Sequence, residues 1–394
     1  MTVAYITTYD SNDINQWSGL GYYMCKCLSD QNVEVILVNC DVPYSPWLKL
    51  KAKTILTLSG KIYQRDRDHG YLKQVAAIAE QKLKNINYDL ILSPGSLAIT
   101  YINSKKPIVF WTDATYDGLV GFYPAWKNLS RQTIINGNLA EQIAINKASL
   151  IFYTSEWAIN SAKNRYGANS KKLMQIPFGS NFEGHQSVSD IEELISKRLS
   201  NKIINLLFIG VEWERKGGEH AVETVVELRN RGINATLTIA GCYPPRKYQH
   251  VPYIEFYPFI SKETENGIHK LNMLYQKATF FVLPTKADCF PVVFSEACSY
   301  GLPIITSNVG GCLSAVIEDV NGYCLDNRQF PESAAEKIVA VLQSPEKYHM
   351  LSVNSFDQFK TKLNWKVIGT KAVEQMSNLI KYSGSVPAYQ TDKV

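Results

Sequence analysis

The chain has 394 residues, more than a single ordinary hydrophobic core supports, so we expect two domains of similar size. Apolar residues make up 45% of the chain and charged residues 20%, a balance typical of a folded globular protein. The net charge of +5 is small for this length and gives no reason to expect a nucleic-acid binder. Residues 1–182 carry 19 Lys and Arg against 13 Asp and Glu, which favours an anionic ligand or surface there.

The beginning of the chain and its cysteines and histidines indicate a cytoplasmic protein. The first residues, MTVAYITTYDSND, lack the basic and apolar regions of a signal peptide, and no apolar run is long enough to span a membrane. The eight cysteines form no CxxC pair, and neither they nor the six histidines have the spacing of a zinc site. We therefore expect no bound metal.

Short apolar, β-branched runs alternate with helical patterns along the whole chain, which predicts βαβ units and parallel sheets. The strands predicted in the first half are Val3–Thr8, Val33–Asn39, Asp89–Leu92, Ile108–Trp111 and Leu150–Tyr153. Those predicted in the second half are Asn205–Gly210, Ala235–Ala240, Tyr253–Phe256, Thr279–Leu283, Ile304–Thr306 and Gly322–Leu325. The predicted fold class is α/β, with two Rossmann-like, doubly wound domains facing across a cleft.

The domain boundary falls in a polar stretch between the two sets of strands. We predict a first domain over residues 1–182, a linker over 183–204 and a second domain over 205–364. Ser189 and Glu192 have the spacing of a capping box that opens a short helix in the linker. An amphipathic helix over 365–382 is expected to pack back on the first domain, before a tail over 383–394.

The most informative stretch follows the predicted strand Thr279–Leu283. Pro291 suits the first position of a helix, so Asp288 and Glu296 would flank the start of that helix. Free N–H groups at a helix start suit phosphate, and ionised carboxylates accept hydrogen bonds from hydroxyl groups. Together they describe a nucleotide-sugar site; the alternative is a loop acid and an acid that stabilises the helix dipole. The backbone expected to bind the donor at this helix start belongs to Cys289, Phe290, Pro291, Val292 and Val293.

The pattern D-C-F-P-x-x-x-x-E-A-x-S-x-G-x-P-I-I, which begins at Asp288, resembles the signature of family-4 glycosyltransferases. It is similar to their acid-x7-acid motif, with Asp288 in place of the usual first Glu. The resemblance implies a GT-B fold, an acceptor-side first domain and a second domain that binds a nucleotide sugar. It also implies transfer with retention of configuration and no metal requirement. By the same resemblance, Asp288 holds the hydroxyls of the donor sugar and Glu296 holds the ribose.

A second group of residues follows the predicted strand Asn205–Gly210. Arg215 and Lys216 precede a glycine-rich helix start, an arrangement suited to a diphosphate. The segment is similar to the family's G-R-x4-K-G motif, in which Lys216 matches the lysine and Val211 stands at the arginine position. Arg215 is a candidate for the missing charge. The alternative for Lys216 is an ordinary solvated surface lysine.

Three further places match the family's donor site more weakly. Gly19 and Gly21, after the first strand, occupy the place of the glycine loop that faces the donor's sugar and distal phosphate. Many relatives carry a catalytic histidine where this chain has Thr112 or Asp113, so Asp113 is a catalytic candidate; the alternative is an aspartate that caps the next helix. The backbone groups of Phe259 and Ile260 lie in a loop resembling the one that edges a uracil base.

Two other features have competing interpretations. Asp66 and Asp68 form a DxD triplet, but it sits in a charged stretch rather than after an apolar strand, so we interpret it as chance. The segment 46–63 is basic and amphipathic. It fits an ordinary surface helix with snorkelling lysines, which we favour, or a helix lying on an anionic membrane at the inner face of the plasma membrane.

The sequence thus predicts a metal-independent glycosyltransferase that uses a nucleotide sugar, with UDP-glucose as the best guess. The acceptor would be a glycan or lipid-linked glycan of polysaccharide biosynthesis. Candidate catalytic residues are Lys216, Asp288 and Asp113. Two alternatives stay open: a nucleotide-sugar epimerase on the same two-domain plan, and a sugar-nucleotide-binding subunit without activity.

Overall fold

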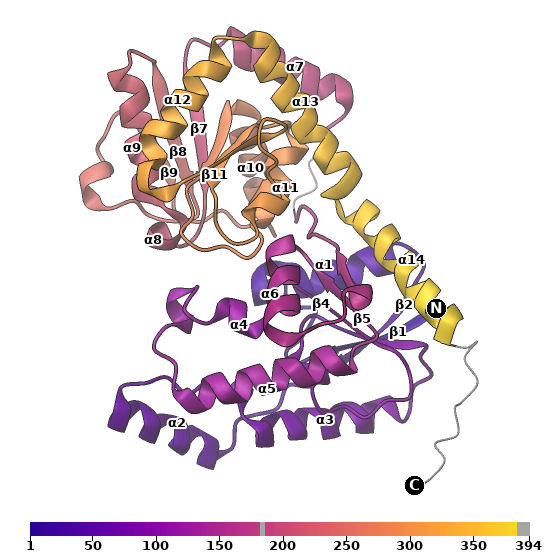
Figure 1. Cartoon of the computed structure of the whole chain (residues 1–394). Helices are drawn as coiled ribbons and strands as arrows, with labels where there is room; N and C mark the ends of the chain where they lie inside the picture. The colour runs from indigo at the N-terminus through magenta and orange to yellow at the C-terminus, as the bar shows by residue number, and fades with distance from the viewer. Residues whose placement is uncertain (182–185, 384–394) are drawn as a thin grey trace. The chain divides into compact units, whose positions relative to one another are not determined.

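The computed structural model describes residues 1–181 and 186–383, and the chain divides into two compact units. Unit 1 comprises Met1–Ile176 together with the chain from Trp365 onward, and unit 2 comprises Pro177–Asn364. In Figure 1, unit 1 runs from indigo to magenta and ends in the yellow α14, while unit 2 has the colours between. Each unit has its own parallel sheet, so each is described by itself.

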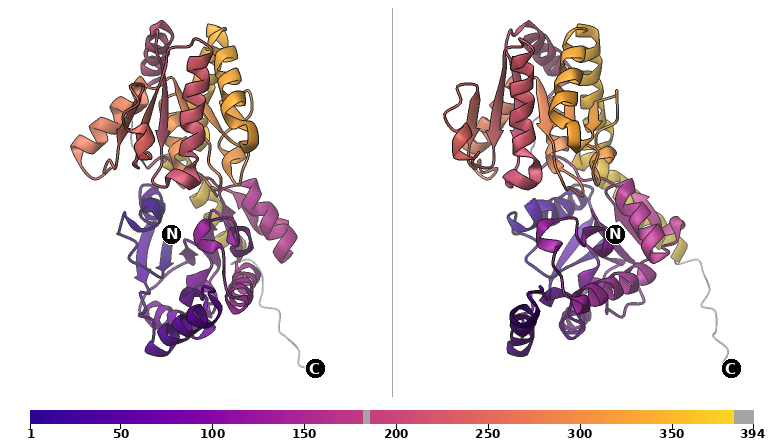
Figure 2. Two further views of the ribbon diagram at one scale, coloured as in Figure 1. Left: turned by 90° about the vertical axis from the view of Figure 1, so that its left-hand side faces the viewer. Right: turned by 60° about the vertical axis from the view of Figure 1, so that its left-hand side comes forward.

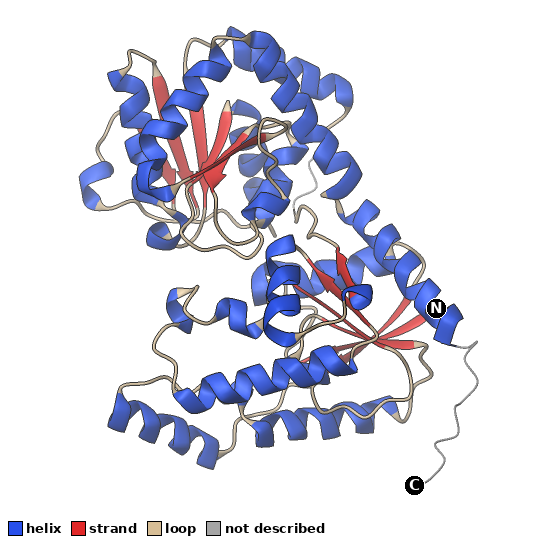
Figure 3. Ribbon diagram, viewed as in Figure 1, coloured by secondary structure: helices blue, strands red, loops and turns tan. Residues whose placement is uncertain are grey.

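Unit 1 is built on a six-stranded parallel sheet in the order β2-β1-β3-β4-β5-β6. Its strands are β1 (Thr2–Thr7), β2 (Glu34–Asn39), β3 (Leu90–Ser93), β4 (Ile108–Thr112), β5 (Leu150–Tyr153) and β6 (Leu173–Gln175). Strands β3 and β5 are buried along their whole length, because helices lie on both faces of this sheet (Figure 3). That burial explains why they read as continuous apolar runs in the sequence.

The helices of unit 1 follow its strands in alternation, as βαβ connections require. They are α1 (Leu20–Ser29), α2 (Pro46–Ser59), α3 (His69–Leu83), α4 (Tyr116–Leu119), α5 (Arg131–Lys147), α6 (Glu156–Tyr166) and α14 (Trp365–Ser383), with short 3-10 turns η1 (Gln16–Gly19), η2 (Arg65–Arg67), η3 (Leu97–Ile99), η4 (Pro124–Trp126) and η5 (Ser170–Lys172). Side-chain caps set several starts: the Ser130 hydroxyl accepts from Thr133 N at α5, and that of Ser155 accepts from Ala158 N at α6.

The last helix, α14, lies with unit 1 although it follows all of unit 2 in the chain. Gly369 lies so close to α1 that a Cβ there would meet the Cys27 carbonyl oxygen at 2.5 Å. At the start of α14, the Trp365 ring stacks on Tyr23, with centroids 6.1 Å apart. The helix expected over 365–382 therefore contacts α1. Most of the tail expected over 383–394 lies outside the described residues.

Unit 2 has a second six-stranded parallel sheet, in the order β12-β11-β10-β7-β8-β9. Its strands are β7 (Ile204–Ile209), β8 (Ala235–Ala240), β9 (Ile254–Tyr257), β10 (Phe280–Leu283), β11 (Ile304–Ser307) and β12 (Gly322–Leu325). The two views in Figure 2 show the helices of unit 2 on either side of this sheet. Strands β10 and β11 are fully buried between them.

The helices of unit 2 complete the second doubly wound domain. They are α7 (Val188–Ser200), α8 (Trp213–Lys216), α9 (Gly218–Asn230), α10 (Glu265–Lys277), α11 (Val292–Ser299), α12 (Phe330–Leu342) and α13 (Pro345–Lys362), with 3-10 turns η6 (Arg246–Tyr248), η7 (Cys312–Ser314) and η8 (Asn327–Gln329). Over residues 1–181 and 186–383, no helix is long and apolar enough to cross a membrane.

The boundary between the units differs from the one expected. The chain divides after Ile176 rather than after residue 182, and the described part of the segment expected as a linker, 183–204, belongs to unit 2. Helix α7 is held there by Arg198, a buried residue whose guanidinium donates to the carbonyl oxygens of Tyr275, Tyr300 and Gly301. A linker would expose this residue, whereas here it ties together backbone groups of unit 2.

Two local expectations were wrong. The capping box of α7 is formed by Ser187 and Asp190, two residues before the expected Ser189 and Glu192. Strand β6 was not expected, since its three residues, Leu173–Gln175, are only half-buried and give no apolar run. Its pairing with β5 extends the sheet of unit 1 by one edge strand.

Each sheet has a switch point where its strand order reverses. In unit 1, β1 lies between β2 and β3, and in unit 2, β7 lies between β8 and β10. The loops after these neighbouring strands run to opposite faces of the sheet and leave a crevice at the carboxyl ends. Ligands of open α/β sheets bind in such crevices, so the two switch points are the places to look for a site.

Candidate active site

The switch point of unit 2 holds an ion pair between two residues that the sequence singled out. Lys216 is the last residue of α8, Asp288 lies in the loop after β10, and Lys216 Nζ lies 2.5 Å from Asp288 Oδ2. Only 12% and 8% of the two side chains are exposed. Since β7 and β10 are neighbours in the sheet, the loops that follow them meet at one edge. The chain thereby brings the two predicted residues into one charged cluster.

Two glycines allow Lys216 to approach this loop. Gly217, which ends α8, has a left-handed φ of 77°, and a Cβ there would meet the Pro284 carbonyl oxygen at 1.9 Å. A Cβ on Gly210 would meet Lys216 Cγ at 2.9 Å. A side chain at either position would displace α8 or the lysine, which gives the glycine-rich pattern around Lys216 a structural reason.

Arg215 lies at the edge of the same cluster but is bound to protein groups. Its guanidinium donates to the Ala287 carbonyl oxygen at 2.9 Å and to the Glu212 carboxylate at 2.6 Å. Its Nη1 lies 3.8 Å from Asp288 Oδ2. Hydrogen bonding from Arg215 also lowers the pKa of Glu212. The two cations of the cluster therefore face two carboxylates, and Val211, at the motif's arginine position, is 64% exposed.

Helix α11 begins directly beyond Asp288. It starts at Val292, with Pro291 at the cap position, one residue later than expected. The Gly311 N–H donates to the Asp288 carbonyl oxygen at 3.0 Å, which fixes the loop before the helix. The N–H groups of Val292 and Val293, in the first turn, have no acceptor within the helix. The rest of the segment, Cys289 and Phe290, is buried and closes the loop against unit 2.

Glu296, the second predicted acid, is fully buried in α11. Its Oε2 accepts a hydrogen bond from the Tyr275 hydroxyl at 2.8 Å, and its Oε1 is bound by the Lys262 ammonium. Burial and the neighbouring Glu296 carboxylate raise the pKa of Tyr275 well above its usual value. Both partners went unnoticed in the sequence. Lys262 could have been predicted, because it lies in the same loop after β9 as Phe259 and Ile260, the residues expected to edge a base.

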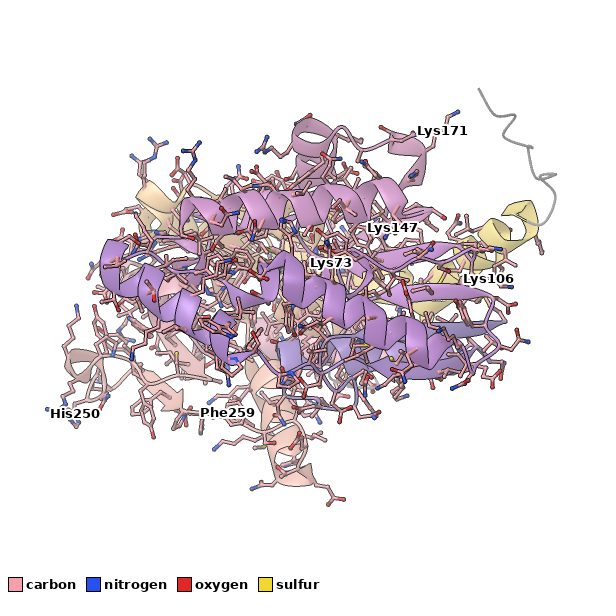
Figure 4. The ribbon with its side chains drawn as sticks, turned by 90° about the horizontal axis from the view of Figure 1, so that it is seen from below. Lys73, Lys106, Lys147, Lys171, His250 and Phe259 are labelled. Carbon is pink, nitrogen blue, oxygen red and sulfur yellow. The ribbon has the colours of Figure 1, made fainter. Side chains whose placement is uncertain are left out.

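The loop after β9 carries the two residues expected to edge a base. Phe259, labelled in Figure 4, is 72% exposed, and Ile260 is half-buried. Two residues separate Phe259 from Lys262, whose ammonium reaches Glu296. One short loop therefore connects the predicted base-binding position with the predicted ribose reader.

In unit 1, the predicted glycine loop has a packing role. Gly19 has a left-handed φ of 79° and precedes α1. Gly21 is covered by Tyr9: a Cβ on this glycine would meet the Tyr9 hydroxyl oxygen at 2.5 Å. The two neighbouring non-glycine residues, Trp17 and Ser18, also have positive φ values of 46° and 55°. A contact of Gly19 or Gly21 with a donor stays a prediction.

Asp113 lies after β4 and lines a cavity of about 290 Å³ at the switch point of unit 1. The alternative that it caps the following helix is wrong, because Thr115 caps α4 by accepting a hydrogen bond from Gly118 N. Thr112 lines the same cavity. Both residues considered for the histidine position therefore border one pocket.

The DxD triplet has a structural role in unit 1. Asp68 caps α3 through hydrogen bonds from the N–H groups of Gly70 and Tyr71, and its other oxygen binds Lys51 and Tyr63. Asp66 lies 3.6 Å from Arg67 Nε. Across the described parts of the chain, no group of three or more His, Cys, Asp or Glu residues could hold a metal ion.

The arrangement defines a class: an α/β protein of two doubly wound units whose charged residues gather at the switch points. Over its whole length, the structure is similar to sucrose-phosphate synthase from Thermosynechococcus elongatus, with a TM-score of 0.67, 17% identity and coverage of 97% of this chain and 100% of that one. It is also similar to Anabaena HepE in complex with UDP-glucose, with a TM-score of 0.60, 16% identity and coverage of 96% and 100%. The fold is GT-B.

Residues 204–344 match the family model described as glycosyl transferases group 1. The capsular polysaccharide biosynthesis glycosyltransferase CapM of Staphylococcus aureus is 23% identical over 270 residues, 62% of this chain and 66% of CapM. An uncharacterised glycosyltransferase of Methanocaldococcus jannaschii is 27% identical over 201 residues, 49% of this chain and 47% of that protein. The matches thus span between about half and two thirds of these relatives. Residues 204–344 are thus similar to glycosyl transferases group 1, and the chain has the GT-B fold.

Proposed function

We propose that the protein transfers a sugar, with retention of configuration, from a nucleotide diphosphate to a hydroxyl of a glycan or lipid-linked glycan. The observation that carries the proposal is the Lys216–Asp288 pair beside the start of α11, at the switch point of unit 2. A diphosphate placed there would meet an ammonium group and helix N–H groups, and a sugar would meet a carboxylate. The match of residues 204–344 to the glycosyl transferases group 1 model supports the reaction type.

The chemistry that this cluster would perform is stabilisation of a leaving group. As the glycosidic bond breaks, negative charge grows on the diphosphate, and Lys216 and the first-turn N–H groups of α11 would stabilise it. Lys216 already has a carboxylate partner at 2.5 Å, so binding of a diphosphate would exchange that partner for phosphate oxygens. Asp288 would then accept hydrogen bonds from the donor's sugar hydroxyls.

The nucleoside would bind along α11 and the loop after β9. Glu296 would accept from the ribose hydroxyls, in exchange for its present contacts with Tyr275 and Lys262. Phe259 and Ile260 would edge the base with their backbone groups. We favour UDP-glucose as the donor, because solved structures of the similar Anabaena HepE contain UDP-glucose, or UDP and glucose. We also propose that Gly19, Gly21 and Asp113 of unit 1 contribute to the reaction.

Donor binding and turnover test this proposal directly. A ligand that binds only the folded state raises the stability of that state. A thermal-shift screen of UDP- and GDP-sugars should therefore show the largest stabilisation with UDP-glucose, the donor we favour. Slow release of free sugar from the donor without acceptor would distinguish an active enzyme from a sugar-nucleotide-binding subunit without activity. Appearance of an epimerised donor would favour the epimerase. Stabilisation by no nucleotide sugar would contradict the proposal.

Activity should not depend on a metal ion, because Lys216 and backbone dipoles would meet the charge of the diphosphate. Transfer measured in excess EDTA should equal transfer in untreated protein. Loss of activity that manganese restores would contradict this and direct attention back to Asp66 and Asp68. The measurement is a comparison of initial rates before and after dialysis against the chelator.

The acceptor is proposed to be a glycan in polysaccharide biosynthesis, and the S. aureus relative CapM bears a name from that process. Helix α2 supports a peripheral contact with an anionic membrane at the inner face of the plasma membrane. Several of its large apolar residues are exposed, among them Trp47 to 79% and Leu58 to 82%, and its lysines Lys49 and Lys53 are exposed as well. Figure 4 shows the side of unit 1 on which α2 and α3 lie, with Lys73 of α3 labelled. Sedimentation with vesicles containing phosphatidylglycerol tests this contact.

A further inference from the structure

The cavity at the switch point of unit 1 contains buried polar groups that the donor site does not use. It has a volume of about 290 Å³ and lies at the carboxyl ends of β1, β3 and β4, bordered also by η2, α4 and α5. Three of its side-chain atoms are buried without a hydrogen-bond partner among the described residues. They are Tyr9 Oη, Arg67 Nε and Glu141 Oε1.

Glu141 is the most deeply placed of the three, with 3% of its surface exposed. Its Oε2 accepts a hydrogen bond from the Ser96 hydroxyl at 2.5 Å, while Oε1 has no such partner in the described chain. A buried carboxyl oxygen without a donor is unfavourable, because water would otherwise solvate it. Residues Ala140, Ala144 and Ile145 of the same helix are buried in the core. Glu141 therefore sits on the core face of α5, at the wall of a cavity.

Arg67 is held rigidly on the other side of the cavity. Its guanidinium lies over the rings of Tyr116 and Trp126, 5.1 and 5.4 Å from their centroids, and 11% of the side chain is exposed. Its Nε lies 3.6 Å from Asp66 Oδ2, beyond hydrogen-bond distance. The stacking positions a cation whose Nε–H has no acceptor in the described structure.

The chemistry of the lining selects a type of ligand. Glu141 Oε1 accepts hydrogen bonds when ionised, Arg67 donates, and the Tyr9 hydroxyl does both; a ligand hydroxyl can serve each of them. Two acids, Asp113 and Glu141, stand against the single cation Arg67, so a phosphate or carboxylate would meet more negative than positive charge. The rings of Trp17 and Tyr116 add apolar wall. A neutral polyol with an apolar face fits these groups better than an anion.

We propose that this cavity binds one neutral sugar ring, the terminal unit of the acceptor, through hydrogen bonds to Glu141, Arg67 and Tyr9. The inference rests on the proposed glycosyl transfer and adds the class of acceptor: a neutral sugar end rather than a phosphorylated or uronic one. A position at the switch point of the sheet, the usual ligand crevice of such folds, supports the site independently of the side chains.

The experiment is saturation-transfer NMR on the full-length chain, with and without saturating UDP. The neutral probes are the methyl α-pyranosides of glucose, galactose and mannose, and the charged probes are glucose 6-phosphate and glucuronate. At least one neutral glycoside should show saturation transfer and bind more tightly than both charged probes. Glu141→Gln and Arg67→Gln should each weaken its affinity at least tenfold. The control Arg131→Gln, at an exposed position of α5, should bind like the parent protein.

The outcomes separate this inference from the proposed function. If UDP binds but no neutral glycoside does, or if a charged probe binds more tightly, the cavity does not have the role we assign. Parent-like glycoside affinity in both Glu141→Gln and Arg67→Gln would also overturn it. If a glycoside binds at the cavity but UDP does not bind at all, the proposed transferase function fails instead. Melting temperatures of all variants confirm that they are folded.

Discussion

The switch points of the two units differ in how their charges are satisfied. In unit 2, Lys216, Arg215, Asp288 and Glu296 all have charged or hydrogen-bonding protein partners. In unit 1, the Glu141 carboxylate oxygen Oε1 and the Arg67 nitrogen Nε both lack a hydrogen-bond partner in the described chain. The same topology thus supports a charge-paired crevice in one unit and an incompletely satisfied crevice in the other.

The difference suggests two modes of ligand binding. In the paired crevice of unit 2, a ligand has to exchange existing ion pairs, which suits a diphosphate that carries enough charge to compete. In the crevice of unit 1, a ligand supplies hydrogen bonds that the protein lacks, which a weakly binding neutral group can do.

The largest effect is expected for the lysine of the paired crevice. Lys216→Ala should lower kcat/KM about 10²–10³-fold, the loss typical of one preorganised donor to a developing anion. Because the charge on the diphosphate grows in the transition state, kcat should fall as well as donor affinity. Lys216→Arg should restore part of the activity, since it keeps the charge with a different geometry. Steady-state kinetics with UDP-glucose measure kcat and kcat/KM of the parent protein and of both variants.

Lys202→Ala is the matched control, because this lysine is exposed and precedes β7, whereas the loops of the crevice follow the carboxyl ends of the strands. It should keep the parent kinetics. An unchanged kcat in Lys216→Ala would remove the lysine from the reaction.

The two acids of α11 and its preceding loop should have separable effects. Substitution of either acid by its amide removes a charged acceptor, which contributes about 1.5–3 kcal/mol to binding, or roughly 10–10²-fold in affinity. Asp288→Asn should weaken the binding of UDP-glucose more than that of UDP, because we propose that its carboxylate binds the sugar hydroxyls. Glu296→Gln should reduce the preference for UDP over 2′-deoxy-UDP, because we propose that its carboxylate binds the ribose. If the two variants show the same pattern across these ligands, the separate roles of the acids are wrong.

A smaller effect is expected at the position where the family's arginine is missing. Arg215 donates hydrogen bonds to Glu212 and to the Ala287 carbonyl oxygen, so its charge is already used within the protein. Val211→Arg should therefore tighten UDP binding by a few-fold, in the range of one partly exposed ion pair. Val211→Gln controls for the larger side chain without the charge. Tightening of equal size in both variants would mean that charge is not the cause.

The smallest effect concerns stability and pH in unit 1. Burial raises the pKa of the Glu141 carboxyl above its usual value. Between the usual and the raised pKa, the folded state holds a proton that the unfolded state releases. The contribution of Glu141 to the stability of the folded state is therefore fully present below the usual carboxyl pKa and is lost as pH rises through the raised pKa. The melting temperature of Glu141→Gln should therefore rise relative to that of the parent as pH increases. Each kcal/mol of relative stabilisation should shift it by about 2–4 °C. A pH-independent difference between the two proteins would contradict the raised pKa.

The sequence predicted the fold well because the information is local. Buried parallel strands are continuous apolar runs, and eleven of the strands stand out for that reason, whereas β6 is a short, half-buried edge strand that gives no such signal. The segment 183–204 was expected to be a linker because its residues, Arg198 among them, look like surface residues in the sequence. Only the folded chain shows the Arg198 guanidinium buried against carbonyl oxygens from two later segments.

The site was predicted in part. Asp288 and Lys216 lie in a recognisable motif after strands, and the structure brings them together. Arg67 was hidden in a charged stretch interpreted as chance, since its stacking partners, such as Trp126, are far away in sequence. Glu141 did leave a signal: it continues the buried face that includes Ala140 and Ala144, where an acid needs a reason.

The central claim, that the crevice of unit 2 binds a nucleotide diphosphate, is tested most directly by calorimetric titration of UDP. The parent chain and Lys202→Ala should bind UDP with equal affinity and one-to-one stoichiometry, and Lys216→Ala should bind it at least tenfold more weakly. Equal UDP affinity in all three proteins would contradict the claim.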